Sequence, residues 1–170
     1  METADFARLV DEHADAVRGF VWRRAAGLDA GVSDPEDISA DVWAVAWQRR
    51  EFAPDISVPG ACRAWLLQIA RFQIANHIRK TVHRRETNRM LRPAEIAAAS
   101  AESIVVADAE LQSALAALSP AEREVFALAV WDGLTPKQIG VVTNASANAV
   151  SIRLHRAKRK LQNELGERNQ

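Results

Sequence analysis

The stretch 135-TPKQIGVVTNASANAVSIRLHRAKRKL-161 decides the fold of this 170-residue chain. A helix-turn-helix needs a small residue where its two helices cross, a turn residue that tolerates a positive φ angle, and an apolar anchor early in the second helix. Gly140, Asn144 and Val150 meet these three needs at spacings of four and six residues. The stretch therefore predicts a helix-turn-helix whose second helix begins after Ser146.

The second helix of this motif has two chemically different faces. Val150, Leu154, Ala157 and Leu161 form an apolar stripe at helical spacing, which predicts the buried side. Polar and cationic side chains elsewhere on the helix could contact base edges and phosphates in a DNA major groove. The candidate DNA-binding residues are Asn148, Ser151, Arg153, His155, Arg156 and Arg159. The alternative is a helical hairpin with a solvated basic face.

The rest of the chain shows no strand-like alternation of apolar and polar residues, so we expect an all-α protein. Capping-box patterns predict helix starts at Ser33 (with Glu36 reaching back), Ser119 and Thr135, and Gly133 predicts a helix end. The helices are expected at about 6–21, 33–50, 61–80, 107–118, 119–133, 135–143 and 147–165.

In residues 86–106 the apolar side chains show only weak helical periodicity, and the Ala and Ser content is high. This region is therefore predicted to be a connector between helical segments. The sequence therefore predicts two small helical domains, at 1–88 and 108–170. A flexible linker at 89–107 joins them, and the helix-turn-helix lies in the second domain.

The charges of the chain sum to zero, with 22 basic and 22 acidic side chains, but they are unevenly distributed. Net charges of −5, +6, −5 and +4 fall on residues 1–70, 71–92, 93–150 and 151–170. Helix dipoles explain one or two basic residues at a helix end, but not seven within 71–92. Two electropositive patches therefore predict an anionic partner despite the neutral total.

The first basic patch continues an amphipathic helix. Its cations could follow a phosphate backbone, while Asn76 and His77 could make directional contacts. The candidates are Arg71, Asn76, Arg79, Lys80, Arg84 and Arg85. The alternative is a solvated face whose arginines complement the helix dipole.

Trp43 and Trp47 stand four residues apart beside the acidic residues Asp34, Asp37 and Asp41. Tryptophans at this spacing are typical of a core, and helix dipoles favour acidic residues at the helix start. The other interpretation is a surface for a basic protein partner.

Several classes of protein are excluded by composition. Cys62 has no partner cysteine, no run is long and apolar enough for membrane insertion, and the N-terminus does not resemble a signal peptide, so we expect a cytoplasmic protein. The four histidines are dispersed, and no catalytic or metal-binding motif occurs. We therefore predict no enzyme activity, no catalytic residues, no metal and no cofactor.

Three segments in order resemble the extracytoplasmic-function group of bacterial RNA polymerase sigma factors. The segments are 34-DPEDISADVWAVAWQRR-50, 64-AWLLQIARFQIANHIRKTVHRR-85 and 115-LAALSPAEREVFALAVWDGLTPKQIGVVTNASANAVSIRLHRAKRKL-161. They are similar to the core-polymerase-binding helix, the −10 melting and recognition segment, and the −35-binding domain of that family.

The resemblance implies an alternative sigma factor that binds the polymerase core enzyme and recognises promoter −10 and −35 elements. Core contacts would come from Asp34, Asp37, Asp41 and Trp43, facing the clamp helices of the largest subunit, and from a contact with the flap of the second-largest. The first basic patch would bind −10 DNA, and the last helix −35 DNA. The loop near 51–62 would capture a flipped −10 base. An anti-sigma factor would provide regulation.

Two other functions remain open. A conventional helix-turn-helix transcriptional regulator with a helical sensory domain would explain the C-terminal motif alone. A helical metal-dependent hydrolase would use Asp34, Asp37 and Asp41 with scattered histidines.

Overall fold

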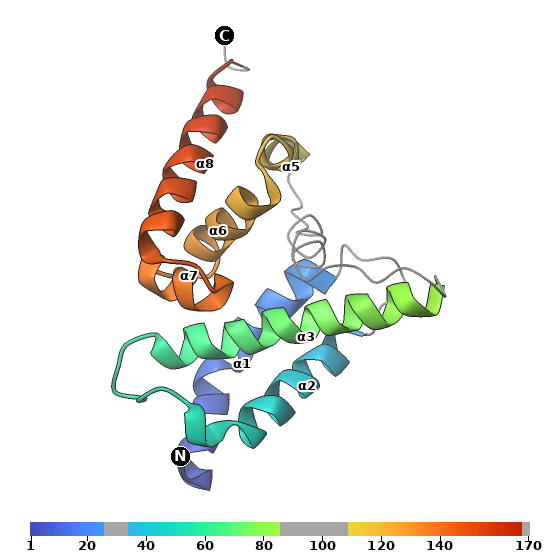
Figure 1. The fold of residues 1–170 in the computed structure, drawn as a ribbon, viewed down its shortest axis with the longest axis vertical. Helices are drawn as coiled ribbons and strands as arrows, with labels where there is room; N and C mark the ends of the chain where they lie inside the picture. The colour runs from blue at the N-terminus through green and yellow to red at the C-terminus, as the bar shows by residue number, and fades with distance from the viewer. Residues whose placement is uncertain (26–33, 86–108, 168–170) are drawn as a thin grey trace.

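A computed structural model describes residues 1–25, 34–85 and 109–167, and every regular element in these ranges is helical. The predicted all-α fold is confirmed. The predicted linker at 89–107 lies outside the described residues. The elements are α1 (Thr3–Ala25), α2 (Pro35–Gln48), the 3-10 helix η1 (Arg50–Phe52), α3 (Ala61–Arg85), α5 (Ala109–Ala116), α6 (Pro120–Val130), α7 (Pro136–Thr143) and α8 (Ala147–Glu167) (Figure 1).

Helices α1, α2 and α3 form the N-terminal domain, in which each helix contacts the other two. Apolar residues recur on α1 at positions 17, 20 and 21, a spacing that places them on one face of a helix. This face is buried against the apolar faces of α2 and α3. The buried residues are Val17, Phe20, Val21, Ile38, Val42, Leu66, Leu67 and Ile74.

The start of α2 differs from the prediction that placed its N-cap at Ser33. The N-cap is Asp34, whose side chain accepts a hydrogen bond from the Glu36 backbone N–H at 2.9 Å, and Pro35 takes the first helical position. A carboxylate is favoured there because it accepts the orphan N–H and faces the positive end of the helix dipole. Ser33 itself lies outside the described residues.

The other two predicted capping boxes are confirmed. At α6, the Ser119 N–H donates to Glu122 Oε2 at 2.9 Å and the Glu122 N–H donates to Ser119 Oγ at 3.3 Å. Thr135 and Gln138 make the same reciprocal bonds at α7. Gly133 has the predicted left-handed conformation, at a φ of +62°, but the predicted helix end at this residue is wrong, because α6 ends at Val130 with Trp131 as its C-cap.

The helix-turn-helix of α7 and α8 has the predicted geometry. Gly140 accepts a backbone hydrogen bond from Ala145 at 2.9 Å, and a Cβ atom on Gly140 would lie 2.6 Å from the Ala145 carbonyl oxygen. Asn144 ends α7 at a φ of +54°, and Val150 is fully buried. The small residue, the left-handed turn and the apolar anchor are therefore all required by the crossing of the two helices.

Helix α8 is held on α6 by an ion pair as well as by apolar packing. Lys160 Nζ lies 2.7 Å from Glu122 Oε2, and Ala157 and Leu161 are buried. The hydrogen bond from Lys160, together with those from Ser119, lowers the pKa of Glu122 from 4.5 to about 2. Glu122 thus caps α6 and anchors α8 with the same carboxylate.

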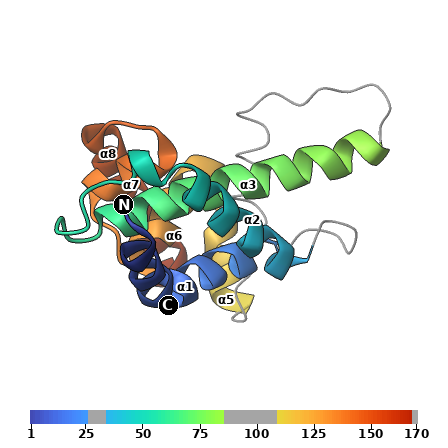
Figure 2. The same cartoon turned by 90° about the horizontal axis from the view of Figure 1, so that it is seen from below.

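The N-terminal and C-terminal domains are packed on each other, which the sequence did not predict. Helix α7 contacts the N-terminal part of α3, where Figures 1 and 2 both place the two helices side by side. The largest apolar cluster is continuous across this contact. Its members from the C-terminal domain are Val125, Leu128, Leu134, Ile139, Val142 and Val150.

Replacing Gly140 with Ala should destabilise the protein by about 2 kcal/mol, because the new methyl group must displace the backbone of the turn. Thermal or urea unfolding measures the change. Gly133→Asn is the control, because Asn tolerates a positive φ and nothing lies within 4 Å of a Cβ there; it should cost less than about 1 kcal/mol. Equal losses in the two variants would contradict the close approach at Gly140.

Replacing Lys160 with Met should flatten the acid dependence of stability. The low pKa of Glu122 means that its stabilisation is present above the unfolded pKa and is lost as the pH falls toward the folded pKa of about 2. Without Lys160 the two pKa values approach each other, so the free energy of unfolding should fall less between about pH 5 and pH 2. Lys158→Met, at an exposed position of α8, is the control and should follow the wild-type slope.

Candidate nucleic-acid interface

The exposed face of α8 is the most open of the candidate surfaces. Asn148, Ser151, His155, Arg156 and Arg159 are all exposed, whereas Arg153 is half-buried. The five exposed residues share the side of α8 away from its buried stripe, whereas Arg153 lies between that side and the stripe. The Ser151 hydroxyl donates to the Ala147 carbonyl oxygen at 2.9 Å, within the helix. The candidates from sequence are thus brought together on one helix face except for Arg153.

The last part of α3, after the buried Ile78, carries the second candidate surface and extends beyond α1 and α2 (Figures 1 and 2). Arg79 and Lys80 are exposed, and Arg79 donates to Asn76 Oδ1 at 3.0 Å. Arg84 and Arg85 belong to the last turn of α3, but their side chains lie outside the described part of the structure.

Arg71 is not part of this exposed surface in the structure. Its Nε and Nη2 atoms donate to the two carboxylate oxygens of Glu124 at 2.6 and 3.2 Å. Glu124 lies on α6 and is buried, so this bidentate pair joins the two domains. The sequence prediction grouped Arg71 with the other cations because no local signal reveals a partner 53 residues away.

The acidic candidates lie on α2. Asp34, Asp37 and Asp41 are exposed, whereas Trp43 is half-buried against the core and lies edge-on to Phe6. The packing of Trp43 matches the core interpretation, whereas Trp47, the other tryptophan of the pair, is 37% exposed and packs on one side against the Phe6 ring.

Asp41 also has a partner that the sequence analysis missed. His77 Nε2 of α3 lies 2.9 Å from Asp41 Oδ2, and His77 is buried. The contact ties the acidic face of α2 to the helix that carries the basic patch.

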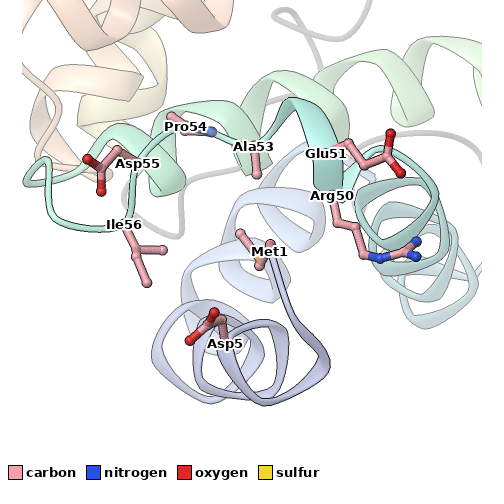
Figure 3. Close-up of a pocket in the computed structure, with 8 residues that line it drawn as sticks. All are labelled: Met1, Asp5, Arg50, Glu51, Ala53, Pro54, Asp55 and Ile56. Carbon is pink, nitrogen blue, oxygen red and sulfur yellow. The ribbon is translucent and has the colours of Figure 1, made fainter.

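A pocket opens beside the loop after α2, in the region near 51–62 where the resemblance implies base capture; the contribution of Met1 and of Asp5 from α1 could not be inferred from the sequence. It has a volume of about 220 Å³ and lies between the start of α1, η1 and the following loop (Figure 3). Asp55 shapes the loop by accepting the Ser57 N–H at 2.8 Å, a bond that lowers the pKa of the Asp55 carboxyl. The lining residues are Met1, Asp5, Arg50, Glu51, Ala53, Pro54, Asp55 and Ile56.

Large apolar side chains are exposed around the same loop. Phe52, at the end of η1, is 80% exposed, and Ile56 and Val58 are also exposed. An exposed aromatic ring beside a pocket is a platform on which a nucleic-acid base could stack.

The residues that could bind a metal are dispersed. Among the described residues, no group of three His, Cys, Asp or Glu side chains could hold a metal ion. Cys62 is buried, which raises the pKa of its thiol. No helix in the described ranges is long and apolar enough to cross a membrane.

Two protein-family models match the two parts of the chain that carry these surfaces. The model for Sigma-70 region 2 matches residues 9–84, which contain α2, the loop and most of α3. The model for Sigma-70, region 4 matches residues 108–161, which contain the helix-turn-helix. Together the two models match most of the chain.

Similar curated proteins belong to the same group. The ECF RNA polymerase sigma factor BldN of Streptomyces coelicolor is 26% identical in an alignment of 172 residues, and the alignment covers 94% of this chain. The ECF RNA polymerase sigma factor SigC of Mycobacterium tuberculosis is 27% identical over 152 residues, which cover 89% of this chain. The chain spans 60% of the length of BldN and 80% of that of SigC.

Two solved structures share the fold. The sigma factor RpoE of Bartonella quintana, in complex with the anti-sigma factor NepR, has a TM-score of 0.63 at 20% identity, over 95% of this chain and 97% of that one. CnrH, in complex with the cytosolic domain of CnrY, has a TM-score of 0.58 at 24% identity, over 98% of this chain and 90% of CnrH. Because both sigma-70 regions are matched in order along most of its length, this chain belongs to the sigma-70 family, in its extracytoplasmic-function (ECF) group.

Proposed function

We propose that this protein is an alternative sigma factor, which binds RNA polymerase core enzyme and directs promoter-specific transcription initiation. The observation that carries the proposal is the presence on one chain of two exposed basic surfaces, on α3 and α8, following an exposed acidic face on α2. A regulator that binds only through its helix-turn-helix has no use for the acidic face on α2 or the basic surface on α3. Such a protein acts by binding in the cytoplasm and makes or breaks no covalent bond.

The −35 element would be bound by α8 in the major groove. Asn148, Ser151 and His155 carry hydrogen-bonding groups suited to base edges, and Arg156 and Arg159 suit phosphates or guanine. Lys160 lies on a different side, where it holds Glu122, so it positions the helix.

The −10 element would be bound by α3 and the loop after η1. Arg79 and Lys80 are exposed where they could follow the phosphate backbone. Arg84 and Arg85 come next along the same helix and are proposed to join them. A base unstacked from the duplex would enter the pocket beside Asp55 or stack on Phe52, and these contacts would offset the few kcal/mol of unstacking.

The core polymerase would be bound by the acidic face of α2, with Asp34, Asp37 and Asp41 toward the clamp helices of the largest subunit. Trp43 would hold α2 in place by packing against the core. The C-terminal domain would contact the flap of the second-largest subunit. RpoE and CnrH were solved with the anti-sigma factor NepR and with CnrY, which supports an anti-sigma factor as regulator here also.

Run-off transcription on genomic fragments, with core polymerase from the same bacterium, tests the proposal. Wild-type protein should direct transcription from specific promoters, and Asp37→Arg should reduce core binding and transcript yield about tenfold or more, because it reverses a charge at the contact. Asp15→Arg, at an exposed position of α1, is the control and should transcribe like wild type. Operator binding without any polymerase-dependent transcription would instead favour a conventional regulator.

Replacing Arg153 and Arg156 with Ala should weaken promoter binding by the holoenzyme and make it less sensitive to salt. Each lost phosphate contact lowers the slope of log affinity against log salt concentration by about 0.9. Binding is measured over a salt series, with thermal unfolding to check the fold. Arg8 and Arg18 are exposed on α1 and provide the matched double Ala control, whose slope should not change. An unchanged slope in the α8 variant would refute phosphate contacts there.

A further inference from the structure

One apolar side chain lies in the middle of the polar face of α8. Ile152 is 45% exposed, and it is the only large apolar residue that is exposed among the side chains of α8 that the structure describes. It comes two residues after the buried Val150, and two residues correspond to about 200° around a helix. Ile152 therefore points almost directly away from the core of the C-terminal domain.

The residues around Ile152 on α8 carry hydrogen-bonding or positively charged groups. Asn148 lies one turn before it, and His155 and Arg156 lie one turn after it, so all three are its neighbours on the helix surface. All three are exposed. The centre of a protein–protein interface is rich in apolar and aromatic side chains, whereas this face offers one apolar residue among polar and cationic ones. Such a face suits DNA better than a protein partner.

The fold itself does not require isoleucine at position 152. Helix α8 lies along an edge of the molecule and packs on α5, α6 and α7 through its buried stripe, which does not include Ile152 (Figure 1). An exposed side chain gains little from the core, and a β-branched residue is a weaker helix former than Ala, Leu or Lys. A contact outside the fold therefore explains this residue better than stability does.

A DNA major groove offers an isoleucine side chain one kind of apolar partner. The purines present acceptors and an amino group there, cytosine presents an amino group, and thymine presents its C5 methyl beside the O4 acceptor. Contact between isoleucine and a polar base edge would remove water from a donor or acceptor without replacing its hydrogen bond, which is unfavourable. Contact with the thymine methyl instead removes apolar surface of both groups from water, which is favourable.

We propose that Ile152 recognises a thymine of the −35 element by packing against its C5 methyl group. The inference rests on the proposed function, because it takes α8 to be the helix that lies in the −35 major groove. Ile152 then distinguishes thymine from cytosine, the pyrimidine that lacks this methyl group. Asn148 and Arg156 make the hydrogen bonds proposed above on either side of it.

The spacing along α8 also places this thymine relative to a neighbouring contact. Asn148 and Ile152 are four residues apart, which is about 6 Å along a helix that rises 1.5 Å per residue. Successive base pairs are about 3.4 Å apart, so the spacing covers about two base pairs at most. The thymine should therefore lie within about two base pairs of the base that Asn148 contacts.

Replacing thymine with deoxyuridine tests the contact, because this change removes only the methyl group and keeps the pairing with adenine. The promoter is one found in the run-off experiment, and each thymine of its −35 element, on either strand, is replaced in turn. The affinity of the wild-type holoenzyme for the promoter should fall about fourfold at one of these positions, which is the factor expected for one buried methyl group.

Substitutions of Ile152 provide the matched test in the protein. Serine has a similar helix propensity and the site is exposed, so Ile152→Ser should keep the melting temperature but lose the preference for thymine over deoxyuridine. Ile152→Val retains a branched apolar side chain and should retain the preference. Val130→Ser makes the same kind of change at an exposed apolar position of α6 and should also retain it. Asn148→Ala should alter base preference within about two base pairs of the sensitive thymine, and a larger separation would contradict the assignment.

The outcomes separate this inference from the proposed function. Equal affinity of the wild-type holoenzyme for thymine and deoxyuridine at every position would overturn the contact with the methyl group, as would an unchanged thymine preference in Ile152→Ser. In both cases the holoenzyme still binds the unmodified promoter, so the proposed function stands. If the wild-type protein gives core polymerase no affinity for the unmodified promoter, the proposed function is overturned, and this inference with it.

Discussion

The burial of α3 is the interaction on which the rest of the structure depends. Helix α3 contacts α1, α2 and α7, so the same helix holds the core of one domain and the docking surface for the other. Leu66, Leu67 and Ile74 are fully buried on this helix, whereas the exposed Arg79 and Lys80 follow on the projecting part. A rigid helix therefore fixes the position of the basic patch relative to α2 and to the loop. The acidic face and the basic patch are further coupled through the His77–Asp41 contact.

The local features of the fold could be predicted because each is determined within a few residues of sequence. The capping boxes at Ser119 and Thr135, the turn at Asn144 and the helix crossing at Gly140 need only a short segment and its backbone sterics. Even so, local competition can shift an element by one residue. Both Ser33 and Asp34 are good N-cap residues, and the carboxylate takes the position.

The contacts between distant segments could not be predicted from one sequence. Arg71 belongs to a run of cations that has the composition of a DNA-binding patch, and only the fold brings Glu124 to it. Arg23 and Asp132 are 109 residues apart, so no periodicity links them. The pocket at Asp55 is likewise formed by the chain start and a loop 50 residues later. For the same reason the sequence predicts two domains but not their packing, because an apolar residue does not indicate which helix will cover it.

The zero net charge of the chain has a structural explanation in these contacts. The acidic block 93–150 supplies Glu122, Glu124 and Asp132, and each carboxylate is paired with a cation from another block. Two of these pairs neutralise Arg23 and Arg71 at the contact between the domains, and the third neutralises Lys160 on α8. Arg79 and Arg156 remain exposed on the two proposed DNA surfaces, whereas other exposed cations, such as Arg8 and Arg18, lie on α1.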